Sequence, residues 1–400
     1  MINLKKVIPL TPEPVYKKRR LEKARLDPYL LLRHEINILL KEQEEKDPPH
    51  YVPHGKGHSE RVYVYAKQIV KALPINIKKA QLDHLNSCEK TLDFMIYLIC
   101  ILHDIGYPKQ MEKGFQKCNH CPEGAHLFNQ KVAPLLKKCL LTEGTPNHTI
   151  EKICKIISDS ILYHGADKKE GLFSFQLNSE LGNFVAKKIP LALPSMFGSV
   201  YVHRLPLTCE GRYIDLFSHK DNKLGIKYFD TDFSDPETFF HALIRLADNM
   251  DSTRQRLHTH QLSVSDKIFQ KLSKNKPTPY QLEHIGLPQI RFDSEKEKEF
   301  YLLLKKDPSQ RKYFFGISLL TELSIHYDKN LASFICEYTL GKYTSVSKYI
   351  LVEHEFLKGE TIPLRDFFIT RLKESFKSIR FSGKEISFRF KKSPLEAVNV

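Results

Sequence analysis

The chain has 400 residues, of which 41% are hydrophobic, and its formal net charge is +15. This length allows two domains or one large core, and the hydrophobic fraction excludes a wholly disordered chain. No run approaches the roughly 20 apolar residues of a membrane-spanning helix. The start, MINLKKVIPLTPEP, lacks the apolar segment and cleavage site of a signal peptide, so we expect a cytoplasmic protein. The basic excess favours an anionic partner, such as a nucleotide.

The eight cysteines are scattered along the chain, which favours reduced thiols over a disulfide framework. Cys118 and Cys121 form the only CxxC pair, in CNHC. A structural zinc site usually has four ligands, so whether this pair binds metal stays open.

Hydrophobic periodicity predicts a mainly helical chain. The expected elements, in chain order, are a helix over 21–45, helices over most of 58–165, strands or hairpins over 172–232, a helix over 236–256, helices over 297–325 and 363–378, and strands over 348–357 and 379–391.

A polar, proline-containing stretch over 263–294 marks the expected domain boundary. We therefore predict a basic N-terminal segment over 1–50 with one helix, a helical core over 51–262 and an α+β C-terminal domain over 263–400 of undetermined role. The core contains a β-rich insertion over 172–232.

Several of the expected helices place a histidine or aspartate at the end of an apolar stripe. His58 heads the stripe Val62, Ala66, Ile69 and Leu73, and His164 ends the stripe Ile150, Ile153, Ile157 and Ile161. The apolar run over 94–102 ends in His103–Asp104, and Asp248 and Asp251 share the inner face of a later helix. His126 falls in the first turn of an expected amphipathic helix.

Burying these groups without partners costs several kcal/mol each, and a shared divalent cation removes that cost. Imidazole and carboxylate together suit Fe, Mn, Co or Zn better than Mg or Ca, and Ni is a further option. Six such ligands fit two ions that share a bridging carboxylate. We therefore expect two divalent transition-metal ions, with Fe or Mn first.

The order of these residues resembles the HD-domain phosphohydrolase superfamily over roughly residues 50–260. HSERV resembles the first-helix motif of the family, LICILHDIG the second, and LIRLADNMD the closing motif. His126 and His164 resemble the extra ligands of the subset that binds two metals, which includes phosphodiesterases of the HD-GYP type. In this sequence GYP directly follows HDI, and His164 is followed by Gly instead of the His–Glu of HD-GYP proteins.

The resemblance implies a helical HD core and a metal site in which Asp104 bridges two ions. It assigns His58, His103 and Asp248 to one ion, and His126 and His164 to the other. His54 and His120 are alternative ligands, ranked lower because they lie in loops flanked by Gly or Cys. The implied reaction is hydrolysis of a phosphate ester by hydroxide, generated from water that the two ions make more acidic.

Four further residues are candidates for contact with substrate or for proton transfer. Lys109 follows Asp104 by five residues, Arg61 lies one turn after His58, and Arg254 lies three residues after Asp251. All three could pair with phosphate oxygens, although surface charge is the favoured interpretation of each one taken alone. Asp251 could accept a hydrogen bond from a ligand histidine or carry a proton. The expected catalytic residues are therefore Asp104, Lys109 and Asp251.

Three functions remain open on the sequence. The first is a metal-dependent phosphohydrolase or phosphodiesterase that acts on a nucleotide or cyclic nucleotide. The others are a non-catalytic nucleotide-binding regulatory protein and a di-iron oxygenase of the HD fold. Nucleic acid is a secondary candidate partner, because no run of Lys and Arg with interleaved aromatics lies beside the motifs.

Overall fold

The computed structural model describes ten ranges of the chain: 27–47, 52–108, 120–164, 204–206, 213–215, 231–274, 279–282, 286–353, 361–376 and 379–392. The chain divides into two compact units. The first contains residues 1–46, 54–247 and 378–383, and the second contains residues 47–53, 248–377 and 384–400. Among the described residues, no helix combines the length and apolar content that a membrane crossing requires.

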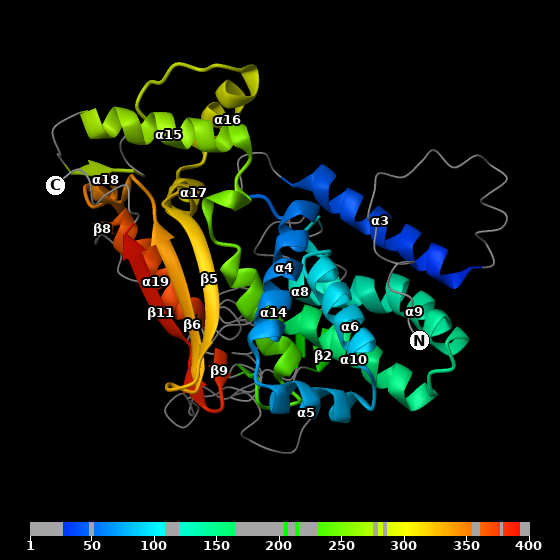
Figure 1. Cartoon of the computed structure of the whole chain (residues 1–400). Helices are drawn as coiled ribbons and strands as arrows, with labels where there is room; N and C mark the ends of the chain where they lie inside the picture. The colour runs from blue at the N-terminus through cyan, green and yellow to red at the C-terminus, as the bar shows by residue number, and fades with distance from the viewer. Residues whose placement is uncertain are drawn as a thin grey trace, which may run out of the picture. The chain divides into compact units, whose positions relative to one another are not determined.

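The first unit is a helical body (Figure 1). Its elements are α3 Pro28–Lys46, α4 Lys56–Ala72, α5 Ile75–Leu85, α6 Glu89–Leu102, α8 His120–Leu127, the π-helix η1 Phe128–Val132, α9 Ala133–Thr142, α10 Asn147–Tyr163, β1 Arg204–Pro206, β2 Tyr213–Asp215, β3 Thr231–Asp232, most of α14 Phe239–Met250, and β9 Ile379–Phe381.

The core of this unit forms around α6, whose residues from Phe94 to Leu102 are all buried. Helices α4 and α10 both pack on α6, and α8 packs on α10 (Figure 1). The stripes that the sequence predicts are buried: Val62, Ala66 and Ile69 of α4 are fully enclosed, as are Ile157 and Ile161 of α10. The polar ends of these stripes therefore meet inside the unit.

Few strands are described in the first unit. Strands β1 and β2 pair antiparallel within the insertion expected over 172–232, and most other residues of that insertion lie outside the described ranges. Strand β9 comes from the far end of the chain and pairs parallel with β3. The carboxylate of Asp232 accepts hydrogen bonds from the backbone N–H groups of Ser382 and Gly383, which fixes this return of the chain.

The second unit combines helices with small sheets. Its elements are η2 Arg254–Arg256, α15 Thr259–Lys274, β4 Tyr280–Gln281, α16 Glu295–Lys306, α17 Pro308–Ser318, β5 Leu320–Asp328, β6 Ser333–Leu340, α18 Thr344–Ser347, β7 Ile350–Glu353, β8 Thr361–Pro363, α19 Leu364–Phe376, β10 Lys384–Glu385 and β11 Ser387–Lys392.

Strand β6 is the centre of the main sheet, with β5 antiparallel on one side and β11 parallel on the other (Figure 1). A smaller sheet has the order β4–β7–β8. The expectation of a mainly helical chain with strands in the C-terminal region is confirmed.

One detail of the sequence prediction is wrong in the second unit, and the expected boundary overlaps a helix. The helices expected over 297–325 end at Ser318, and β5 follows, because the residues after Leu320 alternate in burial as one strand of an antiparallel pair does. The boundary stretch expected over 263–294 begins inside α15, whose buried Val264, Ile268 and Phe269 give it an apolar face. The change of unit falls earlier, between Ala247 and Asp248, near the end of α14.

Candidate metal centre

Four helices of the first unit bring their polar ends together. His58 lies in the first turn of α4, His103 and Asp104 directly follow α6, and His164 directly follows α10. The fourth helix, α8, begins with His120. These helices pack on one another through α6 and α10, so their ends meet in one place.

A glycine allows α8 to approach the turn after α6. A Cβ atom on Gly106 would lie 2.0 Å from the carbonyl oxygen of His120 and 2.4 Å from the backbone nitrogen of Gly124. No side chain fits at such distances, so only glycine permits this contact. The glycine of HDIG therefore sets the position of His120 relative to Asp104.

The carboxylate of Asp104 lies between two pairs of histidines. Its Oδ2 is 3.3 Å from Nε2 of His103 and 3.5 Å from Nε2 of His58. Its Oδ1 is 3.2 Å from Nε2 of His164 and 3.5 Å from Nε2 of His120. Each carboxylate oxygen thus faces one pair of imidazole nitrogens, and the two nitrogens of each pair are 3.2 Å apart.

Backbone carbonyls set the orientation of two of these rings. The Nδ1–H of His103 donates to the carbonyl oxygen of Cys100 over 2.7 Å, and the Nδ1–H of His164 donates to that of Ile161, also over 2.7 Å. A carbonyl can only accept, so in each neutral ring Nε2 carries a lone pair that faces Asp104. A ligand histidine that donates its other nitrogen to a carbonyl is the usual arrangement around a bound metal.

Burial raises the free-energy cost of holding these lone pairs close to the carboxylate of Asp104. His58 is 1% exposed, His103 0%, and both Asp104 and His164 4%. Burial alone would raise the pKa of Asp104, but the surrounding histidines outweigh it and hold that pKa well below its usual value. Burial alone would lower the pKa of His164, but Cys121 and Asp104 outweigh it and hold that pKa well above its usual value. The site therefore requires positive charge, supplied either by protons or by cations.

The donors fit metal ions in both type and spacing. His58, His103 and Asp104 form one group of potential ligands, and His120, Cys121 and His164 form another, with the donor atoms of each group within 4.8 Å of one another. Ligands at about 2.0–2.3 Å from a tetrahedral ion lie about 3.3–3.8 Å apart. The separations of 3.2–3.5 Å around Asp104 agree with this spacing.

The structure brings together four of the six predicted metal ligands: His58, His103, Asp104 and His164. His126 belongs to neither group of donors. The reason is that α8 already includes His120, so His126 lies near the end of that helix and not in its first turn. His120, the lower-ranked alternative in the sequence, stands beside Asp104 instead.

The predicted residues near the closing motif belong to the second unit. Asp248 lies in the last turn of α14 and Asp251 is fully buried beyond it, with Nε of Arg256 at 4.0 Å from its carboxylate. Arg254 pairs with Asp266 at 3.3 Å. Their roles in metal or substrate binding stay predictions.

Two more predicted residues complete the set. Arg61 is half-buried on α4, one turn beyond His58. Lys109 lies outside the described residues, as does Cys118 of the CxxC pair. Their predicted contacts stay predictions.

Sequence reasoning gave too little weight to residues beside the second histidine pair. Sγ of Cys121 is 3.4 Å from Nε2 of His120 and 4.0 Å from Nε2 of His164. The ring of Tyr107 stacks on that of His54 with 4.2 Å between centroids, and its centroid is 5.9 Å from that of His120. The signal in the sequence is the adjacent His–Cys of CNHC, because a histidine and a thiol next to each other are both potential metal ligands.

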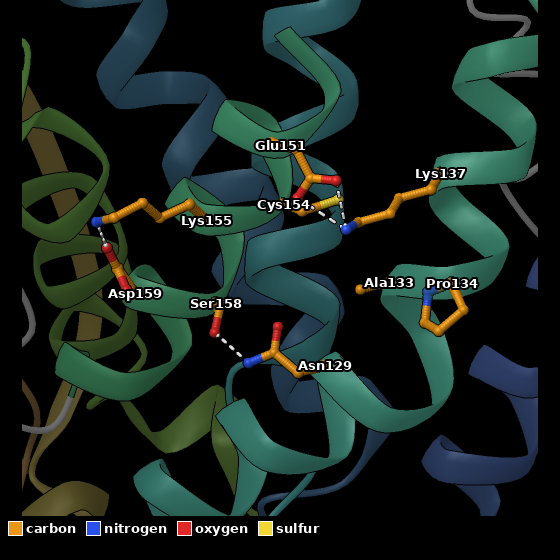
Figure 2. Close-up of a pocket in the computed structure, with 9 residues that line it drawn as sticks. All are labelled: Asn129, Ala133, Pro134, Lys137, Glu151, Cys154, Lys155, Ser158 and Asp159. Carbon is orange, nitrogen blue, oxygen red and sulfur yellow. Dashed lines mark hydrogen bonds and ion pairs between the residues drawn. The ribbon is translucent and has the colours of Figure 1, made fainter. Parts of the chain in front are cut away.

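A cavity of about 550 Å³ lies elsewhere in the first unit, between η1 and α9 on one side and α10 on the other (Figure 2). Its charged and polar groups pair with one another. These pairs are Lys137 with Glu151, Lys155 with Asp159, and Asn129 with Ser158. None of the histidines around Asp104 lines it, so we assign the chemistry to the Asp104 centre.

Comparison of the chain with family models, with curated proteins and with solved structures gives no match. The likeness to HD-domain proteins therefore rests on the motifs HSERV, HDIG and LADNMD.

Proposed function

We propose that this protein is a metal-dependent phosphohydrolase of the HD type, which cleaves a phosphate ester bond of a nucleotide or cyclic nucleotide at a two-metal centre. The observation that carries the proposal is the position of Asp104, whose two carboxylate oxygens each face a pair of histidine nitrogens. A carboxylate placed in this way is suited to bridge two cations.

One cation would be held by His58, His103 and Oδ2 of Asp104, and the other by His120, His164 and Oδ1 of Asp104. When bound, two such ions lower the pKa of a water molecule and stabilise negative charge on phosphoryl oxygens. Asp248 is expected to add a further ligand to the first ion, as the resemblance implies.

The residues of the chain orient this centre and control access to it. The carbonyls of Cys100 and Ile161 hold the rings of His103 and His164 with Nε2 inward. His120 is the most exposed of the four histidines, with 24% of its side chain accessible. Solvent therefore reaches the centre at His120.

The charge of the chain supports an anionic substrate. The net charge is +15, and Arg61 lies one turn from His58. Arg61 and Lys109 are proposed to pair with phosphate oxygens. Arg254 would have to leave Asp266 to do so, and Asp251 is proposed as a proton carrier or as a hydrogen-bond acceptor for a ligand histidine.

The test is hydrolysis of phosphate esters by the full-length protein, stripped with a chelator and then reconstituted with Mn²⁺, Fe²⁺ or Zn²⁺. Bis(p-nitrophenyl) phosphate and p-nitrophenyl phosphate separate diesterase from monoesterase activity, and a panel of nucleotides and cyclic dinucleotides follows. We expect activity that depends on added metal and is lost in Asp104→Asn. The control is Asp83→Asn, at an exposed position of α5, which should remain active.

Two results would contradict the proposal. One is the absence of hydrolysis with every metal and every phosphate ester in a protein that does bind metal. The other is equal activity of Asp104→Asn and the unchanged protein.

A further inference from the structure

We propose that Cys121 is a metal ligand, and that with His120, His164 and Asp104 it forms a closed four-donor site for zinc beside the more open position at His58 and His103. This inference rests on the metal-binding part of the proposed function, and it does not depend on which bond the protein hydrolyses.

The number of donors near His120 fits a zinc site. Nε2 of His120, Nε2 of His164 and Sγ of Cys121 lie within 4.8 Å of one another. Oδ1 of Asp104 is 3.5 Å from the first of these nitrogens and 3.2 Å from the second. Two nitrogens, one sulfur and one oxygen satisfy the four-coordinate preference of zinc.

The second feature is the spacing of these donors. Sγ of Cys121 lies 3.4 Å from His120 and 4.0 Å from His164, while the two imidazole nitrogens are 3.2 Å apart. The sulfur and nitrogen ligands of tetrahedral zinc are about 3.5 Å apart. One contact thus matches and the other is slightly longer, so a small rotation of the thiol group would bring its sulfur to ligand spacing from both imidazole nitrogens.

The third feature is the contrast between the two groups. Among the described residues, the group at His58 consists of His58, His103 and Asp104 and has no thiol, whereas the thiol of Cys121 adds a donor to the group at His120. Closed sites hold metal for structure, and open ones bind water or substrate. The position at His58 would therefore receive the substrate, and the position at Cys121 would hold a fixed charge beside it.

The fourth feature is the type of donor at each position. A thiolate with two imidazoles favours zinc or a comparable borderline-soft ion over Mg²⁺, Ca²⁺ or Mn²⁺. The position at His58 offers only nitrogen and oxygen, which also suits Mn²⁺ or Fe²⁺. The two positions are thus expected to bind different metals when several are available.

Cobalt substitution tests this inference directly. Co²⁺ replaces zinc in such sites, and a cobalt–thiolate bond gives a charge-transfer absorption in the near ultraviolet. We expect this absorption in the cobalt-loaded full-length protein and its loss in Cys121→Ser, together with a fall in zinc affinity of more than about 100-fold, beyond what loss of an outer partner causes.

Two control variants locate the thiolate. Cys154 on α10 is as buried as Cys121, at 5% exposure, and belongs to neither donor group, so Cys154→Ser should keep the absorption. Cys118→Ser should keep it as well. Absorption that survives in Cys121→Ser and disappears in Cys118→Ser would overturn the assignment.

Cobalt binding by the unchanged protein is a test that does not depend on whether a variant folds. If cobalt binds in a stoichiometric amount without thiolate absorption, Cys121 is not a ligand, whether or not its variants fold. Hydrolysis is measured separately on the same samples. Thiolate absorption without hydrolysis would support Cys121 as a ligand and contradict the proposed reaction. Hydrolysis without the absorption would support the reaction and contradict Cys121 as a ligand.

Discussion

His103 and His164 occupy the same position relative to their helices, α6 and α10, although the two histidines lie far apart in the sequence. Each directly follows the last helical residue, and each donates Nδ1–H to the carbonyl of the residue three positions earlier. Helix ends leave carbonyls without intrahelical partners, and these two rings use such carbonyls. The ends of α6 and α10 thereby fix Nε2 toward Asp104.

At the residue scale, α8 offers a matched pair for testing the ligand assignment. His120→Ala should lose one metal ion per chain, because it removes a nitrogen 3.5 Å from Asp104. His126→Ala, on the same helix, should keep the full metal content, since His126 is in neither donor group. Elemental analysis of the two purified variants decides the matter. If His126→Ala loses metal and His120→Ala does not, His126 is the ligand, as the sequence predicts.

A second prediction at this scale concerns His241, which is 7% exposed on α14. Burial, followed by the charges of Arg245 and Lys155, lowers its pKa to about 3. Its ring also packs edge-on against Tyr163 at 5.4 Å between centroids. The folded protein therefore holds this histidine neutral, whereas the unfolded chain protonates it below about pH 6.5.

Because the pKa of His241 is lower in the folded protein than in the unfolded chain, the free energy of unfolding falls as the pH falls. The contribution of His241 to stability is complete above about pH 6.5 and falls as the pH drops toward 3, by up to about 1.4 kcal/mol per pH unit. His241→Gln should lose this part of the pH dependence. Denaturant unfolding at about pH 7 and about pH 4.5 gives the change in the free energy of unfolding between the two pH values. An equal change in His241→Gln and in the unchanged protein would contradict the prediction.

At the element scale, the contact of α8 with the turn after α6 depends on Gly106. Gly106→Ala places a methyl group against the backbone of His120, so α8 has to move. We expect a loss of about 1–3 kcal/mol in the free energy of unfolding and the loss of metal from the second position, because two of its proposed ligands, His120 and Cys121, lie on α8.

The control for this change is Gly286→Ala, where the added methyl group meets no atom within 4 Å. Thermal unfolding and metal analysis of both variants test the prediction. Metal at the first position, held by α4 and α6, should persist in both. A Gly106→Ala protein with unchanged stability and metal content would show that this contact does not position the site.

The same contact explains why part of the site was predicted from the sequence and part was not. His58, His103 and His164 end apolar stripes, and helical periodicity alone directs them inward. His120 and Cys121 have no such stripe before them. Their direction depends on how closely α8 approaches Gly106, which is a tertiary contact that periodicity does not report.

Strands show the same division between local and long-range information. Strands β7 and β11 overlap the strands expected over 348–357 and 379–391, but their parallel partners, β4 and β6, lie far earlier in the sequence. Strand β9 pairs with β3 across about 150 residues, so the C-terminal part of the chain contributes to the first unit. Domain limits drawn at single points along the chain cannot express such a return.

At the scale of the whole molecule, the first unit holds the donors around Asp104, and the closing motif LIRLADNMD runs from the first unit into the second at Asp248. The role of Asp248 as a metal ligand stays a prediction. The basic charge is a property of the whole chain and supports anionic substrates.

The most direct test of the central claim is the number of transition-metal ions per chain, measured by elemental analysis of the full-length protein and of Asp104→Asn. Because both oxygens of Asp104 face histidine pairs, the account predicts about two ions in the unchanged protein and near-complete loss of both in the variant. One ion or fewer in the unchanged protein after reconstitution, or a variant that keeps both, would contradict the bridging role of Asp104.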